Sequence, residues 1–235
     1  MKVTLVLDHG YVVLIEAWGS DERIVEAARM STGKGFNGWG TPDIPGDEKL
    51  LQYLYNHKHA TPFEMAGMVI EVKAPIFVFR EWHRHRTQSY NEMSARYIPL
   101  PDENYLPTVE AIVERSGMNA NKQASGLRQC HEPQAKAWLA ELAALYEQAQ
   151  HVYASGIVYG VPKELARLPV PVARYSRMRA SANLRNWLAF LTLRMAPNAQ
   201  WEIRQYANAV GDLIAENFPR TWALFAAENT AAERL

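Results

Sequence analysis

The chain has 235 residues, 48% of them hydrophobic, and its 25 basic side chains are balanced by 25 acidic ones. Zero net charge excludes the overall positive field with which general nucleic-acid binders collect phosphates, and no stretch approaches the roughly 20 apolar residues of a membrane-spanning helix. The single cysteine, Cys130, cannot form a disulfide within the chain, so we expect a cytoplasmic protein from a reducing compartment, with no nucleic-acid or membrane partner.

The N-terminal residues predict a β-hairpin followed by a helix. Residues 2–7 and 11–16 are rich in Val, Leu and Ile on either side of Asp8-His9-Gly10, the pattern of two strands around a turn. Ser20 is typical of a residue that caps a helix, and we place that helix at residues 21–28.

The next part alternates between loop, helix and strand. Residues 32–46 contain five glycines and two prolines and predict a loop, after which Gly46-Asp47 opens a short amphipathic helix. Thr61-Pro62 resembles a helix start, residues 68–72 resemble a strand, and Pro75 begins a helix that leads into a strongly charged segment.

The second half is predicted to be mostly helical. Residues 99–131 are rich in proline and polar residues, with one short helical stretch near 109–114, and predict a long excursion. From Glu132 onward, apolar residues recur at helical spacing in three stripes. They begin at Trp138, Leu184 and Ile203. We therefore predict one α+β domain spanning residues 1–235, with a small twisted antiparallel or mixed sheet and a helical bundle.

Two basic segments indicate an anionic ligand. Residues 81–97 (EWHRHRTQSYNEMSARY) combine three arginines and two histidines with Ser and Asn, and arginine forks match phosphate oxygens in a bidentate way. Residues 163–204 carry eight basic and two acidic side chains. In a neutral protein, such local clusters favour a phosphate-bearing ligand over ordinary solvated arginines, although any single arginine can be an ordinary surface residue.

Three other functions remain as alternatives for these residues. His57-Lys58-His59 and His83-Arg84-His85 each place two imidazoles two residues apart, which permits a metal site, but the neighbouring cations would repel a divalent ion. Aromatic residues alternate with the arginines, as in proteins that bind single-stranded nucleic acid. Cys130 as a nucleophile lacks an identifiable base. We favour none of these and predict no metal.

The string RHRTQSYNEMSARY, residues 84–97, resembles the signature of flavin-dependent thymidylate synthases, in which Arg-His-Arg, seven intervening residues and Ser form the motif. The resemblance extends over residues 22–225. It includes segments similar to those of the family at HKHATPFE (57–64), VKAPIF (72–77), ELAR (164–167), NLR (183–185) and AQWEI (199–203).

The resemblance implies a homotetramer with shared active sites, FAD as cofactor, and dUMP, methylenetetrahydrofolate and NADPH as substrates. The implied FAD-binding residues are His59, Thr61, Arg84, His85, Arg86, Glu92, Asn183, Arg185 and Asn198. The implied dUMP-binding residues are Glu81, Trp82, His83, Arg84, Glu92, Met93, Ser94, Ala95, Arg96, Arg167 and Arg194. Arg194 is implied to be catalytic, because a guanidinium beside the uracil can stabilise negative charge as N3 ionises.

Two departures from the family pattern are expected to affect flavin binding. Ala189 occupies a position where an amide-bearing Asn is expected, and Asn198 occupies one where many relatives have His. The leading hypothesis is reductive C5 methylation of dUMP to dTMP. A homologue that methylates or hydroxymethylates another uridylate such as UMP is the nearest alternative, and a non-catalytic nucleotide-binding protein is the alternative from a different class.

Overall fold

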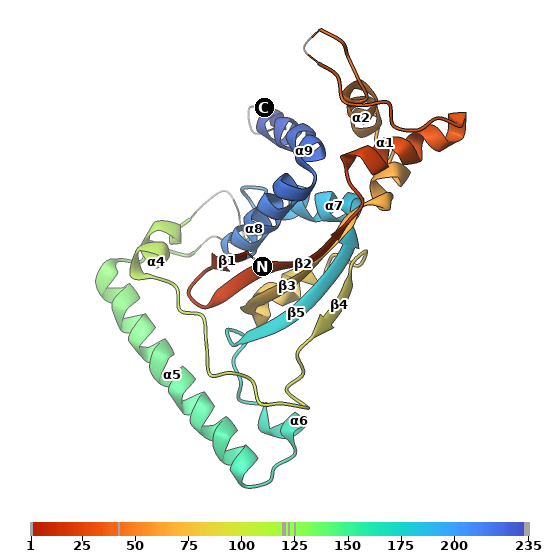
Figure 1. Cartoon of the computed structure of the whole chain (residues 1–235). Coiled ribbons are helices and arrows are strands. Elements are labelled where there is room, and N and C mark those ends of the chain that lie inside the picture. Colours follow the sequence, from red (N-terminus) through yellow and green to blue (C-terminus); the bar gives the residue numbers. More distant parts are fainter. Residues whose placement is uncertain (1, 42, 119–120, 122, 125, 233–235) are drawn as a thin grey trace.

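The computed structural model describes the chain except for residues 1, 42, 119–120, 122, 125 and 233–235. A five-stranded antiparallel sheet, in the order β1-β2-β3-β5-β4, runs through the middle of the molecule (Figure 1). Its strands are β1 (Val3–Val6), β2 (Gly10–Trp18), β3 (Gly67–Pro75), β4 (Ser89–Glu92) and β5 (Tyr175–Asn183). The predicted α+β class is therefore confirmed, and the pairing is antiparallel throughout the described residues.

Helices occupy most of the remaining described chain. The α-helices are α1 (Asp21–Arg29), α2 (Glu48–Asn56), α3 (Ile76–Trp82), α4 (Val109–Arg115), α5 (Glu132–Val158), α6 (Lys163–Ala166), α7 (Leu184–Arg194), α8 (Trp201–Asn217) and α9 (Pro219–Ala232). Two short 3-10 helices are η1 (Met30–Thr32) and η2 (Thr61–Met65). None of the helices in the described part is long and apolar enough to cross a membrane.

The predicted N-terminal hairpin and the helix after it are confirmed. β1 and β2 pair through Val6 and Gly10, and Leu7 in the turn between them has a left-handed φ of 58°. Ser20 is the N-cap of α1, where its side chain accepts a hydrogen bond from the Arg23 amide. Such a cap satisfies an amide that the helix itself leaves unpaired.

The alternation of side chains along β3 and β5 gives the sheet one buried and one polar face. Val72 lies opposite Met178 and Ile70 opposite Ala180, all buried, whereas the residues between them on β5 include the exposed Arg179. One packed and one polar face is a common arrangement for an antiparallel sheet. β5 was not predicted, because its arginines were interpreted only as ligands for an anion.

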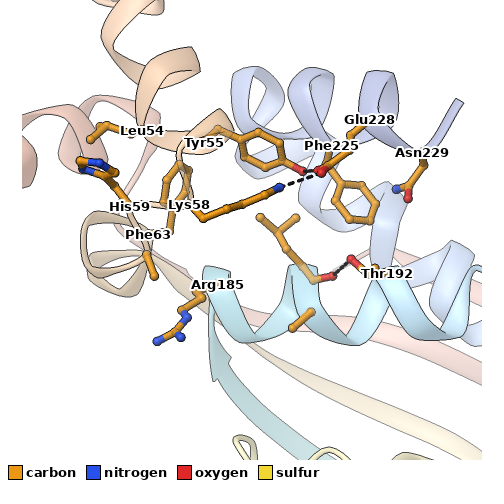
Figure 2. A pocket seen from close by; sticks show the side chains of 13 residues that line it. Leu54, Tyr55, Lys58, His59, Phe63, Arg185, Thr192, Phe225, Glu228 and Asn229 are labelled. Atoms are coloured by element: carbon orange, nitrogen blue, oxygen red, sulfur yellow. Dashed lines mark hydrogen bonds and ion pairs between the residues drawn. The ribbon is translucent and has the colours of Figure 1, made fainter. Parts of the chain in front are cut away.

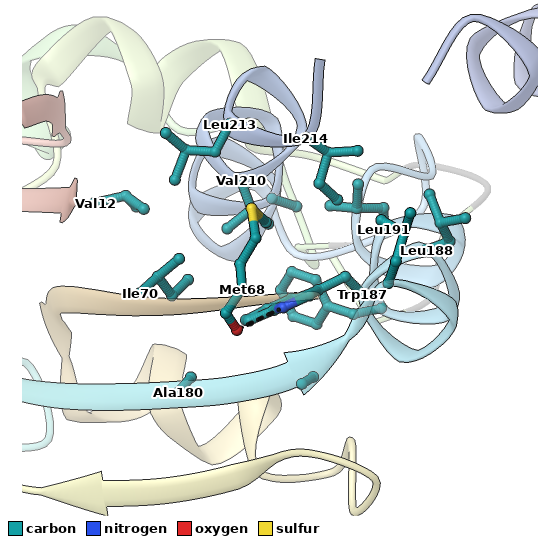
Figure 3. Close-up of a cluster of buried hydrophobic side chains, with 14 of the residues drawn as sticks. Val12, Met68, Ile70, Ala180, Trp187, Leu188, Leu191, Val210, Leu213 and Ile214 are labelled. Atoms are coloured by element: carbon teal, nitrogen blue, oxygen red, sulfur yellow. Dashed lines mark hydrogen bonds between the residues drawn. The ribbon is translucent and has the colours of Figure 1, made fainter. Parts of the chain in front are cut away.

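The core lies between this buried face and helices α7 and α8 (Figure 3). Trp187 of α7 is fully buried, and its indole N–H donates to the Met68 carbonyl of β3 at 3.2 Å. Leu191 of α7 and Val210 and Ile214 of α8 pack in the same cluster. The helical stripes predicted from Leu184 and Ile203 are thus the faces that cover the sheet.

Helix α5 lies at one end of the molecule, with the sheet between it and helices α1 and α2 (Figure 1). Only Ala135 and Tyr153 of its 27 residues are buried, whereas Trp138 and Leu145 are 49% and 60% exposed. The helix predicted from that apolar stripe is confirmed. Within a single chain, however, the stripe does not face the core.

Part of the predicted excursion at residues 99–131 is hydrogen-bonded to the residues around the start of β5. Asn104 forms a bridge with Arg174, and the Tyr105 amide donates to the Ala173 carbonyl at 3.0 Å. The fully buried Arg174 guanidinium donates to the Pro101 carbonyl at 2.8 Å and to Gln150 of α5 at 2.9 Å. This arginine therefore joins the segment and α5 to the start of β5.

Candidate functional site

The turn between α3 and β4 carries the Arg-His-Arg motif. Pro75 provides the extended residue before α3, and the helix ends at Trp82, whose buried indole donates to Gln88 at 3.0 Å. The Tyr90 hydroxyl donates to the His85 carbonyl at 2.7 Å and lies 3.2 Å from the Trp82 carbonyl. These contacts close the turn, and Arg84 and Arg86 remain outside the core.

Trp82 itself has a structural role. It is fully buried and stacks on Phe190 of α7, with ring centroids 4.6 Å apart. Its predicted contact with the substrate can therefore involve only its main chain. The neighbouring His83 is also turned towards the sheet, with Nε2 3.1 Å from the Met178 sulfur.

Arg194, at the end of α7, is held against the motif by three hydrogen bonds. Its Nε donates to His85 Nε2 at 2.8 Å, Nη1 donates to Glu81 Oε2 at 2.9 Å, and Nη2 donates to the Glu81 carbonyl at 3.1 Å. A guanidinium has five N–H bonds, so two are not engaged by the described residues and can serve a ligand. The Arg194 side chain is 16% exposed, which leaves an edge accessible.

His85 is the uncharged member of this cluster. Burial and then the nearby Arg194 charge lower the pKa of His85 to about 4, against a smaller opposing effect of Glu81. Because Nε2 accepts the Arg194 hydrogen bond, a neutral ring must carry its proton on Nδ1. At neutral pH the cluster therefore contains one guanidinium, one carboxylate and one neutral imidazole.

The pKa of His85 predicts a pH dependence of stability. The folded value of about 4 lies below the ordinary 6.5, so between these values the unfolded chain binds a proton that the folded chain excludes. Stability should therefore fall as pH decreases from about 7 to 4, by roughly 1–2 kcal/mol after allowance for solvent screening at this half-buried side chain. Chemical denaturation of wild type and His85→Gln over this range measures the effect.

The His85→Gln variant should show a flatter stability profile over the same range, because a glutamine can accept from Arg194 without titrating. His151→Gln, at an exposed position of α5, is the matched control and should follow wild type. Parallel profiles for wild type and His85→Gln would refute the assignment of the pH dependence to His85.

A second group of predicted residues lines a cavity of about 270 Å³ at the start of β5. Four of the predicted substrate residues, Glu92, Met93, Ala95 and Arg167, contribute to its wall. The Met93 amide donates to the Arg177 carbonyl at 2.8 Å, which extends the pairing of β4 with β5. The structure therefore brings residues from separate segments of the sequence resemblance together here.

Ser94 and Arg96 follow directly along the chain. The Ser94 hydroxyl accepts from the Arg96 amide at 3.3 Å, and the Ser94 carbonyl accepts from the Tyr97 amide at 3.0 Å, which makes a tight turn. The exposed Arg96 side chain lies 3.5 Å from Glu164, at the start of the ELAR segment that contains Arg167. Both arginines are exposed and can reach an anion in solvent.

A third group lies between α2, α7 and α9, around a cavity of about 440 Å³ (Figure 2). Its lining includes the predicted cofactor residues His59 and Arg185 and the substituted position Ala189. Figure 2 shows Lys58 directed towards Glu228, and the two form an ion pair at 2.7 Å. Apart from such edge groups the walls are largely apolar, formed by Leu54, Phe63, Leu188, Ala189 and Phe225.

The remaining cofactor predictions have different surroundings. Thr61 is exposed at the start of η2, where the expected helix is only a short 3-10 turn. Asn183 is the N-cap of α7, and its side chain accepts from the Asn186 amide at 3.0 Å. Asn198 lines a separate cavity of about 870 Å³ that also contains Trp201. Within one chain, the predicted cofactor-binding residues therefore lie at several separate places.

The basic segment at residues 163–204 is not gathered into one anion-binding surface. Arg174 is fully buried and lies 3.1 Å from Asp102, and Arg179 lies 3.4 Å from Glu71 on the polar face of the sheet. The interpretation of this segment as one basic zone is therefore wrong, because Arg174 is buried just before β5, whereas Arg179 of β5 lies on the exposed face of the sheet. Arg167, Arg185 and Arg194 are the members beside the groups described above.

The residues missed by the sequence interpretation come from elements that it did not predict. Ser176, on β5, is buried and lines the 270 Å³ cavity. Phe225 and Glu228, on α9, line the 440 Å³ cavity. The alternation of Ser176, Met178 and Ala180 with Arg177 and Arg179 was the available signal for β5.

The histidine pairs are not part of a larger metal-ligand cluster in the described residues, where no group of three or more His, Cys, Asp or Glu side chains is suitably placed. The rings of His57 and His59 have centroids 6.5 Å apart. His57 Nδ1 lies 2.9 Å from the Tyr53 carbonyl, so one of its nitrogens already has a partner.

Comparison with known proteins gives consistent matches. Residues 13–220 match the family model described as Thymidylate synthase complementing protein. A flavin-dependent thymidylate synthase of Thermus thermophilus is 43% identical over 220 residues, which are 94% of this chain and 77% of that protein. The enzyme of the same name from Wolbachia pipientis wMel is 40% identical over 223 residues, covering 94% and 75%.

Solved structures agree with the sequence matches. A UMP/dUMP methylase, PolB from Streptomyces cacaoi, bound with 5-Br dUMP, has a TM-score of 0.82 and 30% identity, over 95% of this chain and 97% of that chain. The same protein bound with 5-Br UMP has a TM-score of 0.80 and 30% identity, over 96% of both chains. Because these matches span nearly the whole chain, both the sheet and the helical layer are shared.

These matches identify the chain as an enzyme of the methyltransferase class. More particularly, the chain belongs to the flavin-dependent thymidylate synthase family. The family predicted from the Arg-His-Arg motif is thus confirmed. The roles of individual residues stay predictions.

Proposed function

We propose that this enzyme converts dUMP to dTMP by reductive methylation at C5, with methylenetetrahydrofolate as carbon donor and NADPH-reduced FAD as reductant. The observation that carries the proposal is Arg194, whose guanidinium is oriented by His85 and Glu81. Two of its N–H bonds have no partner among the described residues and are available to a ligand. A fixed cation of this kind suits a uracil that must become electron-rich. The name of the solved PolB relative, a UMP/dUMP methylase, supports a uridylate as substrate.

Arg194 acts as an electrostatic activator in this mechanism. Its free N–H bonds donate to the uracil and stabilise the negative charge that develops as N3 ionises, which makes C5 more nucleophilic towards the methylene group. Glu81 and His85 hold the guanidinium in place and limit its reorganisation during the reaction. No cysteine nucleophile is required, which is consistent with the position of Cys130 in the segment before α5.

The nucleotide phosphate is bound near the 270 Å³ cavity. Arg96 and Arg167 supply positive charge, and Ser94 supplies a neutral hydrogen bond at the same end. Glu92 and Met93 form the adjoining wall. Because phosphate carries up to two negative charges, exposed arginines at the entrance also favour its approach from solvent.

The 440 Å³ cavity has the chemistry expected for part of a flavin. Its walls are mainly apolar, and polar groups such as His59 and Arg185 lie at the edge (Figure 2). Arg84, His85, Arg86, Glu92 and Asn183 are the other proposed contacts, and Thr61 and Asn198 complete the set. When bound, FAD supplies the reducing equivalent that completes the methyl group.

We further propose that the active enzyme is a homotetramer whose subunits share active sites. Two observations support this assembly. The predicted ligand-binding residues of one chain lie around separate cavities, and α5 exposes Trp138 and Leu145 of an apolar stripe. The molecular mass of the purified enzyme, measured by light scattering, tests the stoichiometry, and a monomer at working concentration would exclude shared sites.

Ala189 is expected to weaken flavin retention. An asparagine at this position would offer the flavin a hydrogen bond that the alanine methyl group cannot make. Ala189→Asn should therefore retain FAD more tightly, by about 1 kcal/mol or roughly fivefold in Kd. Flavin fluorescence titration measures the change, with Ala144→Asn at an exposed position of α5 as control. Equal affinity in wild type and Ala189→Asn would contradict this expectation.

A homologue acting on UMP is the second candidate, favoured by the PolB relative, which is a UMP/dUMP methylase. Parallel reactions with dUMP and UMP, each with methylenetetrahydrofolate, NADPH and the flavin-loaded enzyme, separate the two through the amount of C5-methylated product. Product from dUMP alone or at a higher rate supports thymidylate synthesis. Product from UMP alone would overturn it.

A non-catalytic nucleotide-binding role is disfavoured, because the chain belongs to a family of methyltransferase enzymes. The absorption spectrum of the purified protein tests this alternative directly. Bleaching of a bound flavin on addition of NADPH and dUMP supports the proposed chemistry. Absence of a flavin spectrum after FAD addition, together with absence of methylated product, would favour simple nucleotide binding.

A further inference from the structure

The hydroxyl of Ser176 is a buried polar group without a hydrogen-bond partner in the described structure. The residue is 1% exposed, and it lines the 270 Å³ cavity together with Arg167 and Glu92. A buried hydroxyl that lacks a partner destabilises the folded state, because it has lost its hydrogen bonds to water. Such a group is an unusual feature of a native core and requires a reason.

The position of Ser176 in the sheet explains why its hydroxyl has no partner among the described residues. Ser176 pairs with Ala74 of β3, and the next residue on the same face of β5 is Met178. Alanine has no polar side-chain atom, and the sheet already uses the neighbouring main-chain groups in its ladder. The core therefore ends at Ser176, and the cavity begins there.

The cavity has a distinct chemical character. Its wall is mostly apolar, formed by residues such as Ile76, Leu100 and Val170, and its cationic member is the exposed Arg167. Glu92 contributes the acidic group, which suits a hydroxyl or N–H of a ligand. A ligand that presents an anionic oxygen can be met by Arg167 and by a hydroxyl donor at the same time.

We propose that Ser176 is a substrate-binding residue whose hydroxyl donates a hydrogen bond to a phosphate oxygen of the bound uridylate. This inference rests on the proposed function, because it assumes that a uridylate enters the 270 Å³ cavity. The ligand then restores the hydrogen bond that folding removed. The unpaired hydroxyl destabilises the ligand-free wild-type protein, and this loss of stability is recovered only when the ligand is bound.

This role makes two opposite predictions for one substitution. Ser176→Ala removes the unpaired hydroxyl, so the ligand-free variant should be at least as stable as wild type in thermal unfolding. Its Kd for dUMP should nevertheless be about 10- to 100-fold higher, because a hydrogen bond to a charged group is lost. A residue with a purely structural role would not combine unchanged or raised stability with weaker binding.

Two further variants complete the binding experiment, which uses the flavin-loaded enzyme and isothermal titration with dUMP. Ser176→Thr keeps a hydroxyl and should restore most of the affinity. Ser181→Ala, in the same strand but on its other face, should bind dUMP like wild type. Equal dUMP affinity in wild type and Ser176→Ala would overturn the inference.

The identity of the bonded group is tested by the ³¹P resonance of dUMP bound at saturation. The resonance should differ between wild type and Ser176→Ala and should coincide between wild type and Ser181→Ala. Weaker binding with an unchanged resonance would overturn the phosphate assignment. If wild type itself does not bind dUMP, the proposed function fails, which is a different result from failure of Ser176 alone.

Discussion

Replacement of Arg194 by alanine is expected to reduce dTMP formation by about 10²–10³-fold, the usual effect of losing one oriented donor to developing charge. The physical reason is that His85 and Glu81 fix this guanidinium before substrate arrives, so its contribution to the transition state requires little reorganisation. The measurement is the initial rate of dTMP formation at saturating dUMP, methylenetetrahydrofolate and NADPH. FAD content is determined in the same preparation.

The interpretation depends on separating catalysis from folding and flavin binding. Arg23→Ala is the matched control, because Arg23 lies in α1 and pairs with Glu26 away from the proposed site. It should keep the wild-type rate. If Arg194→Ala bound FAD normally and formed dTMP at a rate near that of wild type, the activation by Arg194 would be wrong. Loss of FAD together with activity would assign Arg194 to cofactor binding.

Replacement of Trp187 by alanine is expected to lower the free energy of unfolding by about 3–5 kcal/mol. Trp187 is fully buried between β3 and α8, and its indole N–H donates to the Met68 carbonyl (Figure 3). The substitution leaves a large cavity and removes the donor for a buried carbonyl. Denaturant unfolding followed by circular dichroism measures the change.

Leu193→Ala is the control for this prediction, since Leu193 lies in the same helix with 61% of its surface exposed. Its effect should stay below about 1 kcal/mol, because little apolar area returns to water. A loss of similar size in both variants would contradict the conclusion that α7 is stabilised mainly by its packing against the sheet.

Local patterns predicted much of the fold. The β1–β2 hairpin, the Ser20 cap and helices α5, α7 and α8 follow from side-chain period and capping chemistry, which act over a few residues. β5 was missed because the charge of Arg177 and Arg179 suggested ligands for an anion, although these arginines alternate with the buried Ser176, Met178 and Ala180. β4 was missed for a related reason, since its four residues lie inside the charged motif.

The candidate site was predicted less completely than the fold. The motif at residues 84–94 indicated the family, and the family is confirmed. The hydrogen bond from Arg194 to His85, however, joins residues 109 positions apart, and no periodic pattern reports such a contact. Ser176 could not be predicted from the sequence for the same reason. Its hydroxyl has no hydrogen-bond partner among the described residues because the residue opposite it in β3 is Ala74, which is distant in the chain.

By itself, the sequence determined the family, the neutral overall charge with local arginine clusters, and the elements set by short-range chemistry. Only the tertiary structure decided which arginines lie beside a candidate site, because burial and pairing depend on neighbours distant in the chain. Arg174 became a buried link to α5, whereas Arg194 was oriented beside the Arg-His-Arg motif. Identical side chains thus acquire different roles from the dielectric and the partners around them.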